Sequence, residues 1–421
     1  MTKIIRGTKD SDQIETTSDE EKIFGLGGDD ILINDLFQFV ELYGGSGDDI
    51  LKLGLEGFEF FEHVSLFGGL GDDFLLGKGA EHDVVFGGGK GDDRFVASES
   101  STARGGAGDD LIYGGGETSG HMGGRGDDIF IGGYTDGFDG GRGHDVIVTE
   151  SEALGGRGND LIFHEGDTNG PMRGGAGADV MISAQEVVAQ GDEGNDIMVG
   201  SPGELDGGRG DDTLFSSTIG AATPPAAGLT GTPLTGGGGD DLLVGAMGDD
   251  TFSGNAGRDT FFLAPGMGSD EITDIDVQSD RVNLSPLFDF SDPNEFLGCA
   301  VQTEFGAMLD FGAGDQLLFR NLATDQLASV NFVLDNAQPV AVALDQLGAA
   351  LTGGSARLAA HAEDIEFMTS QLGFALETEL PLALVPLAEL REHLIGTPEE
   401  PVAGATLPLE GVHTADEWLL V

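Results

Sequence analysis

The chain of 421 residues has little cysteine, little positive charge and no long apolar run. Its single cysteine, Cys299, cannot form an intrachain disulfide, so cysteine does not indicate the redox compartment. The 19 basic residues face 75 acidic ones, a formal net charge of −56, which excludes a nucleic-acid-binding face and a polybasic membrane anchor. The most apolar stretch, around Leu380 to Leu390, contains Pro381 and Pro386 and falls short of the ~18 apolar residues of a membrane helix. We therefore expect a soluble protein.

The amino terminus, MTKIIRGTKDSDQ, lacks the apolar core of a secretory signal peptide. Export by that route is therefore not expected. Although aromatic residues make up only 7% of the chain, 39% of it is hydrophobic, which is enough to bury a core. A folded chain this acidic needs counter-ions, and divalent cations are the first candidates.

Glycine, by contrast, is abundant, with 73 residues, and it is phased in a nine-residue repeat rather than at every third position. In each unit the first and fourth residues are Gly, the sixth is Asp and the eighth is apolar, as in GGAGDDLIY at 105–113. The fourteen units begin at Gly25, Gly44, Gly68, Gly88, Gly105, Gly123, Gly140, Gly155, Gly174, Gly191, Gly207, Gly236, Gly245 and Gly254.

Each part of the unit has a physical role. The glycines permit the positive φ angles and close backbone approach of a tight turn, and the last three residues form a short strand with one face inward. Stacking such strands at ~4.8 Å builds a solenoid in which each turn buries its neighbour. The turn also directs carboxylate and carbonyl oxygens to one point, which is the shell that calcium prefers.

We therefore predict multiple calcium sites. The carboxylate ligands are the sixth-position residues Asp30, Asp49, Asp73, Asp93, Asp110, Asp128, Asp145, Asp160, Asp179, Asp196, Asp212, Asp241, Asp250 and Asp259. The backbone carbonyl ligands are those of Gly44, Gly68, Gly88, Gly105, Gly123, Gly140, Gly155, Gly174, Gly207 and Gly236.

The pattern GGxGxD followed by x-apolar-x resembles the nonapeptide of RTX (hemolysin-type calcium-binding) proteins, over roughly residues 7–280. This resemblance implies an all-β fold: a right-handed parallel β-roll with two nonapeptides per turn and calcium between successive turns. Residues 7–15 resemble a degenerate opening unit, with Asp12 at the sixth position and Ile14 at the eighth.

The spacing of the units departs from that pattern. From Gly44 to Gly207 successive full units begin 15 to 24 residues apart, close to two nonapeptides, and intervening halves such as 114–122 mostly lack the Asp. We therefore predict mainly one calcium column along one edge of the roll, with both edges used only at 236–262. The Pro/Ala/Gly-rich insertion 216–235 is expected to loop out.

Metal should control folding. Stacked carboxylates ~5 Å apart repel by roughly 0.8 kcal/mol per pair even at the dielectric constant of water. Extracellular calcium sites have dissociation constants of about 10⁻⁴–10⁻³ M, so we expect the roll to stay unfolded in a calcium-poor cytoplasm and to fold outside the cell.

Three regions are expected: the roll (1–280), a β-rich capping segment (281–335) and a helical carboxyl-terminal region (336–421). Residues 264–285 and 309–334 resemble the segments that close and flank RTX rolls. Helical spacing from Leu358 to Leu372, and from Pro386 to Ile395, predicts two helices. The final ADEWLLV is similar to the uncleaved signal of type I secretion substrates, which implies the type I secretion apparatus as a partner.

Motifs for catalysis are not found. His164-Glu165 is followed by Thr168 where a zinc-binding HExxH motif needs its second His, and Gly200-Ser201 lies outside a G-x-S-x-G frame. We interpret the eight histidines, among them His63, His82, His121 and His144, as solvated turn residues.

The sequence therefore predicts a secreted, extracellular, non-enzymatic calcium-binding protein of a cell surface or matrix. Two alternatives remain. One is an adhesin with a cell-surface or matrix ligand on the calcium-free edge or the 216–235 loop; the other is a toxin or enzyme active through residues 336–421.

Overall fold

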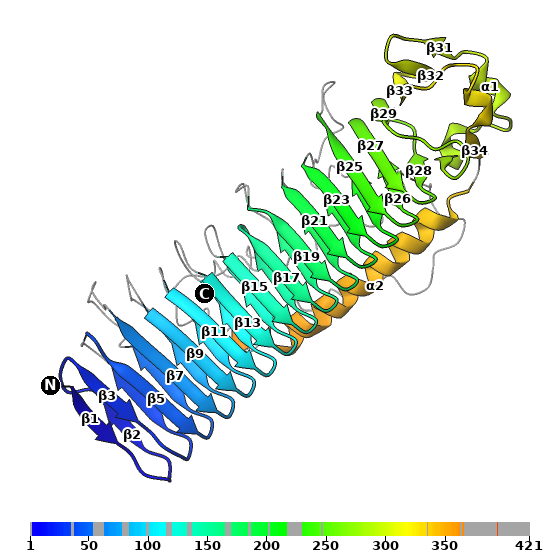
Figure 1. Cartoon of the computed structure of the whole chain (residues 1–421). Helices are drawn as coiled ribbons and strands as arrows, with labels where there is room; N and C mark the ends of the chain where they lie inside the picture. Colours follow the sequence, from blue (N-terminus) through cyan, green and yellow to red (C-terminus); the bar gives the residue numbers. More distant parts are fainter. Residues whose placement is uncertain are drawn as a thin grey trace, which may run out of the picture.

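The computed structural model describes residues 2–34, 38–53, 63–77, 84–97, 101–114, 120–132, 137–164, 170–183, 187–200, 203–216, 230–245, 247–334, 336–362, 364–365 and 394. Within them the chain winds between two facing sheets as a β-solenoid, and Figure 1 shows the turns stacked along one axis. Apart from the pairs β31–β32 and β32–β33, all neighbouring strands in these ranges are parallel, as the predicted roll requires.

The first sheet contains, in spatial order, β1 (Lys3–Arg6), β3 (Glu21–Phe24), β5 (Glu41–Ser46), β7 (Val64–Leu70), β9 (Val84–Lys90), β11 (Ser101–Ala107), β13 (Gly120–Arg125), β15 (Gly137–Arg142), β17 (Ala153–Arg157), β19 (Met172–Ala176), β21 (Val188–Glu193), β23 (Glu204–Arg209), β25 (Thr230–Gly238), β27 (Asp249–Ala256), β29 (Ser269–Ile272), β33 (Asp315–Arg320), β32 (Gly306–Gly312) and β31 (Val301–Gln302).

The second sheet contains β2 (Gln13–Glu15), β4 (Ile31–Asn34), β6 (Ile50–Leu53), β8 (Phe74–Leu76), β10 (Arg94–Val96), β12 (Leu111–Tyr113), β14 (Ile129–Ile131), β16 (Val146–Thr149), β18 (Leu161–His164), β20 (Val180–Ser183), β22 (Ile197–Gly200), β24 (Thr213–Ser216), β26 (Leu242–Gly245), β28 (Thr260–Leu263), β30 (Arg281–Leu284) and β34 (Asn331–Leu334). The described helices are η1 (Pro286–Phe288), α1 (Asn294–Leu297), η2 (Leu327–Ser329) and α2 (Gln338–Ala360).

The repeat sets the register of both sheets. Eighth-position residues stack on each other inside the roll, so that Leu32 pairs with Leu51 and Leu51 with Leu75, all fully buried. The glycine-rich turns lead from the first sheet into the second along what we call the first edge; the returning turns form the second edge. Gly45 and Gly47 have φ angles of 122° and 125°, which L-side chains rarely adopt, so the turn depends on glycine there.

Helix α2 lies along the outer face of the second sheet (Figure 1) and packs Leu344, Leu347 and Leu351 on it. The seventh and ninth positions of the units beneath, such as Ile129 and Ile131, are therefore buried as well. The strands turn their eighth positions inward as predicted; the outer face of these turns is buried in addition, because the helix removes it from water.

The loop prediction for 216–235 is wrong at its ends. Ser216 belongs to β24, and residues 230–235 belong to β25, which pairs with both β23 and β27. Pro233, within residues 230–235, lies at a register shift between β25 and β27, where a missing N–H is tolerated. Residues 217–229 lie outside the described residues.

The carboxyl-terminal part continues both sheets before it turns helical. Strand β33 pairs with β29 and β34 pairs with β30, so these strands of the predicted capping segment extend the two sheets of the roll. Of the predicted helix 358–372, α2 includes Leu358 to Ala360 but begins twenty residues earlier than Leu358, at Gln338. The helix predicted over 386–395 (Leu394 apart) and the terminal ADEWLLV lie outside the described residues. Among the helices described, none combines the length and apolarity needed to cross a membrane.

Candidate metal centre

The sixth-position aspartates of thirteen units form a continuous ladder along the first edge. In each turn the Asp backbone N–H donates to Oδ1 of the Asp in the next turn; Asp93 to Asp110 and Asp110 to Asp128 are both 2.8 Å. The ladder members are Asp30, Asp49, Asp73, Asp93, Asp110, Asp128, Asp145, Asp160, Asp179, Asp196, Asp212, Asp241 and Asp259. All thirteen are buried, so these carboxylates are not part of a solvated surface.

The second carboxylate oxygen of these thirteen residues, Oδ2, is buried without a hydrogen-bond partner. The two residues that end the ladder differ. Asp12 Oδ2 accepts from Thr8 N and Thr8 Oγ, at 2.5 and 2.9 Å, and Asp280 Oδ2 accepts from Asp276 N at 2.7 Å. Because a buried, unpaired carboxylate oxygen is strongly unfavourable, the interior of the ladder favours a bound cation in a way that its ends do not.

The first glycine of each unit leaves the space that such a cation needs. A Cβ on Gly105 would lie 1.9 Å from Asp110 Oδ2 and 2.7 Å from the carbonyl oxygen of Gly123 in the next turn. Equivalent contacts place a sixth-position Oδ2 beside the carbonyl oxygens of Gly25, Gly44, Gly123, Gly140, Gly155, Gly174, Gly207 and Gly236. Gly68, Gly88 and Gly105 hold the same position in their units.

This donor set fits calcium. Within the described part of the chain, no three His, Cys, Asp or Glu side chains converge on one point, so a site here must combine carboxylate with backbone carbonyl oxygens. An all-oxygen, partly backbone shell is what a hard cation takes. Gly25, which the sequence interpretation left out of the carbonyl set, is placed like the others.

Burial dominates the electrostatics of the ladder. It raises the pKa of Asp110 to about 9 and that of Asp73 to about 8; backbone hydrogen bonds partly oppose the shift, and neighbouring aspartates add to it. The shift is smaller elsewhere: the pKa is about 6 for Asp49 and Asp259 near the ends, and also for Asp160 in the interior. Ionising the ladder without metal is therefore costly.

Asp250 stands apart from the other thirteen. It lies on the second edge, where its N–H donates to Asp270 Oδ1 at 2.8 Å and its Oδ2 accepts from Ser216 Oγ at 2.6 Å. Buried aspartates thus lie on both edges near 236–262, where calcium on both edges is predicted. Asp270 is 2% exposed, its Oδ2 has no partner, and burial followed by the Asp250 charge raises its pKa.

Sequence reasoning missed Asp270. Its unit, 265–273, begins with Pro265 instead of Gly, but Gly268, Asp270 and Ile272 keep the fourth, sixth and eighth positions and could have revealed it.

Two histidines are not where they were predicted. His121 on β13 and His164 at the end of β18 are buried inside the roll, not solvated in turns. His121 Nδ1 accepts the N–H of Ala103 at 3.1 Å, and burial lowers the pKa of His164. His82, Glu165 and Thr168 lie outside the described residues.

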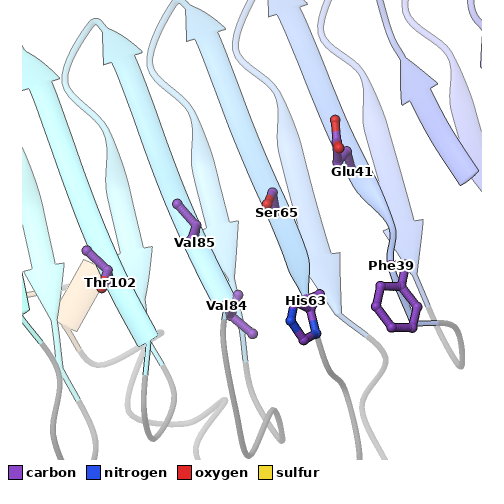
Figure 2. A pocket seen from close by; sticks show the side chains of 7 residues that line it. All are labelled: Phe39, Glu41, His63, Ser65, Val84, Val85 and Thr102. Atoms are coloured by element: carbon purple, nitrogen blue, oxygen red, sulfur yellow. The ribbon is translucent and has the colours of Figure 1, made fainter. Parts of the chain in front are cut away.

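A hollow of about 470 Å³ lies on the outer face of the first sheet (Figure 2). Its lining comprises Phe39, Glu41, His63, Ser65, Val84, Val85 and Thr102. Glu41 is the one carboxylate in this lining, and it is already held by Lys22 Nζ at 2.6 Å and Tyr43 Oη at 2.5 Å. The paired carboxylates of a hydrolase are not among these seven residues.

Taken together, the parallel turns, the glycine cradles and the unpartnered carboxylate ladder define a β-solenoid of the cation-binding kind. The profile of the RTX calcium-binding nonapeptide repeat matches residues 4–35, 40–55, 97–117, 190–217 and 233–263 in four copies. The chain therefore carries RTX calcium-binding repeats, as its sequence pattern indicates. No curated protein matches it significantly.

Proposed function

We propose that the chain is a secreted RTX protein whose roll folds on binding extracellular calcium and which serves, without enzymatic activity, as a component of a cell surface or matrix. One observation carries the calcium step: thirteen buried Asp Oδ2 atoms on one edge lack a partner, while the two ends of the same ladder are satisfied by the protein.

The compartment follows from the affinity expected of such sites. Extracellular calcium modules have dissociation constants of about 10⁻⁴–10⁻³ M, far weaker than cytosolic sensors. Inside the cell the carboxylates of the ladder would repel one another without a bound counter-ion. This repulsion favours the unfolded chain, which is the form suited to export. Outside, each calcium ion would supply two charges and replace missing hydrogen bonds.

The absence of enzymatic activity rests on how the polar groups are arranged. The carboxylates are repeated at equivalent positions along the rod, whereas catalysis needs unlike groups brought together once. The export route rests on the resemblance of ADEWLLV to a type I secretion signal.

The test is a calcium titration of the full chain, followed by circular dichroism and calorimetry, with magnesium as the control ion because it demands a more rigid octahedral shell. We expect β structure to appear with calcium and not with magnesium. Equally complete β structure in excess chelator would contradict calcium-coupled folding, and hydrolytic activity of the calcium-loaded chain would contradict the non-enzymatic role.

Counting bound ions tests the arrangement separately. Equilibrium dialysis should give about one calcium per turn along the first edge, with additional binding only near Asp250 and Asp270. Two ions per turn throughout the roll would be incompatible with a single main column.

A further inference from the structure

Three exposed arginines form a row on the first edge. Arg125, Arg142 and Arg157 occupy the third position of successive units and are register partners on β13, β15 and β17. Successive side chains are therefore about one strand spacing, ~4.8 Å, apart. None of the three makes an ion pair within the described residues, whereas Arg209, farther along the same register, pairs with Glu193 at 3.1 Å.

The turns before this row carry the opposite charge. Their fifth positions are exposed aspartates linked from turn to turn, since each N–H donates to the preceding Oδ1: Asp92 to Asp72 and Asp109 to Asp92 are both 2.8 Å. This acidic segment comprises Asp29, Asp48, Asp72, Asp92 and Asp109; the same ladder continues to Asp127 in the turn of Arg125, and Lys90 is an exposed cation at a third position within the segment. Beside Arg142 and Arg157 the fifth position is neutral, with His144 and Asn159.

Fifth-position carboxylates thus predominate in one part of this edge, and third-position guanidinium groups predominate in the next part, the basic segment (Arg125, Arg142 and Arg157). The strand spacing sets the period of both, so a row of one sign matches a row of the other over several turns.

We propose that two copies of the chain associate side by side and antiparallel, so that the basic segment of each faces the acidic segment of the other. A two-fold axis perpendicular to the rods produces both contacts at once. If a residue of the second copy faces Arg125 of the first copy, the same residue of the first copy faces Arg125 of the second. Placing the axis between the two segments pairs Arg125, Arg142 and Arg157 with Asp109, Asp92 and Asp72 of the second copy. A second copy of this chain supplies rows of the matching period and sign.

The inference rests on the proposed function in one respect: the rows exist only when the roll is folded, and calcium lowers the net charge of −56 that opposes association. Single exposed ion pairs are weak and are screened by salt. Association should therefore depend on several pairs together, require calcium and weaken steeply as the salt concentration rises.

The experiment is sedimentation velocity of the full chain over a concentration series in calcium, with circular dichroism on the same samples. We expect a reversible dimer. Reversing the basic segment (R125E/R142E/R157E) or the acidic one (D72K/D92K/D109K) should raise the dimer dissociation constant by about tenfold or more. An equimolar mixture of the two variants should form a heterodimer, because at the six facing positions one variant carries only acidic side chains and the other only basic ones.

The chain supplies precedents for these changes: Glu193 stands at a third position and Arg258 at a fifth. The matched control is R209E, which disturbs a pair within one copy and should leave dimerisation unchanged.

A folded wild-type chain that stays monomeric would overturn the dimer proposal and leave calcium-coupled folding intact. A chain that does not fold with calcium would instead contradict the proposed function. Unchanged dimerisation of either triple variant, or no heterodimer in the mixture, would also overturn it. So would a monomeric wild type whose arginines instead bind polygalacturonate, since the basic segment would then serve an acidic polymer.

Discussion

At the scale of single residues, the sixth-position aspartate divides its two oxygens between two tasks. Oδ1 accepts a backbone N–H from the preceding turn and so aligns the rod, while Oδ2 remains buried beside a glycine carbonyl. The first task needs only an acceptor, whereas the second needs a negative charge balanced by a cation. A substitution that keeps the acceptor and removes the charge can therefore separate them.

Asp110→Asn is that substitution. Without metal it should stabilise the roll, because it removes the carboxylate whose pKa burial raises to about 9. In saturating calcium it should destabilise the roll by about 1–3 kcal/mol, because a charged ligand is lost. Thermal unfolding in chelator and in calcium measures both effects.

The control for this substitution is Asp109→Asn. Asp109 is exposed, its Oδ1 accepts from Asp127 N at 2.7 Å, and asparagine preserves that bond. Little change is expected under either condition. Equal behaviour of the two variants would show that the buried charge is not what calcium acts upon.

At the scale of elements, the helix α2 is what turns a two-sheet roll into a three-layer structure over its length. Leu347 and Leu351 cover strands of the second sheet, and Gly354 lies against Leu161: a Cβ there would be 2.2 Å from Leu161 Cδ2. Arg357 then reaches the turn backbone, where its Nη2 donates to the carbonyl oxygen of Asp127 at 2.7 Å.

Gly354→Leu tests this docking against Gly353→Leu. Position 354 is closed by Leu161, while a side chain at 353 meets nothing within 4 Å. The first variant should lose about 1–3 kcal/mol and expose the amides of α2 to hydrogen exchange. The second should be neutral or slightly stabilised, since glycine is the poorer helix former. Equal exchange in both would contradict close packing at Gly354.

The contrast between roll and helix shows what the sequence could predict. The repeat predicted the parallel strands, their inward eighth positions and the common edge of thirteen aspartates, because each of these depends on contacts between identical units. It could not predict that Ile129 and Ile131 are buried on both sides, since the covering residues lie more than 200 positions away. His164 was misplaced for a related reason: it follows the repeat unit, in a half-turn whose pattern is too degenerate to assign.

At the scale of the whole molecule, many buried carboxylates with raised pKa values make stability depend on pH. Their unfolded value is near 3.8, and their folded values run from about 6 for Asp196 to about 9 for Asp110. Protons therefore favour the metal-free roll: the contribution is complete below about pH 4 and is lost as pH rises through the folded pKa values.

In chelator, β structure should accordingly increase when pH falls from about 8 to about 5. In limiting calcium the trend should reverse, because protons then compete with the metal for Oδ2. Circular dichroism across this range, with and without calcium, measures both trends. A metal-free chain with no gain of structure on acidification would contradict the burial of these carboxylates.

The ladder also bears on how such a chain can change over generations. The N–H to Oδ1 distance is 2.8 Å whether 15 residues separate the two aspartates, as for Asp145 and Asp160, or 29, as for Asp212 and Asp241. Insertions and deletions between turns are thus absorbed on the returning side without shifting the cation-binding edge. Natural variation in length should collect on that side, and a foreign peptide grafted there would be displayed at regular intervals along an unaltered rod.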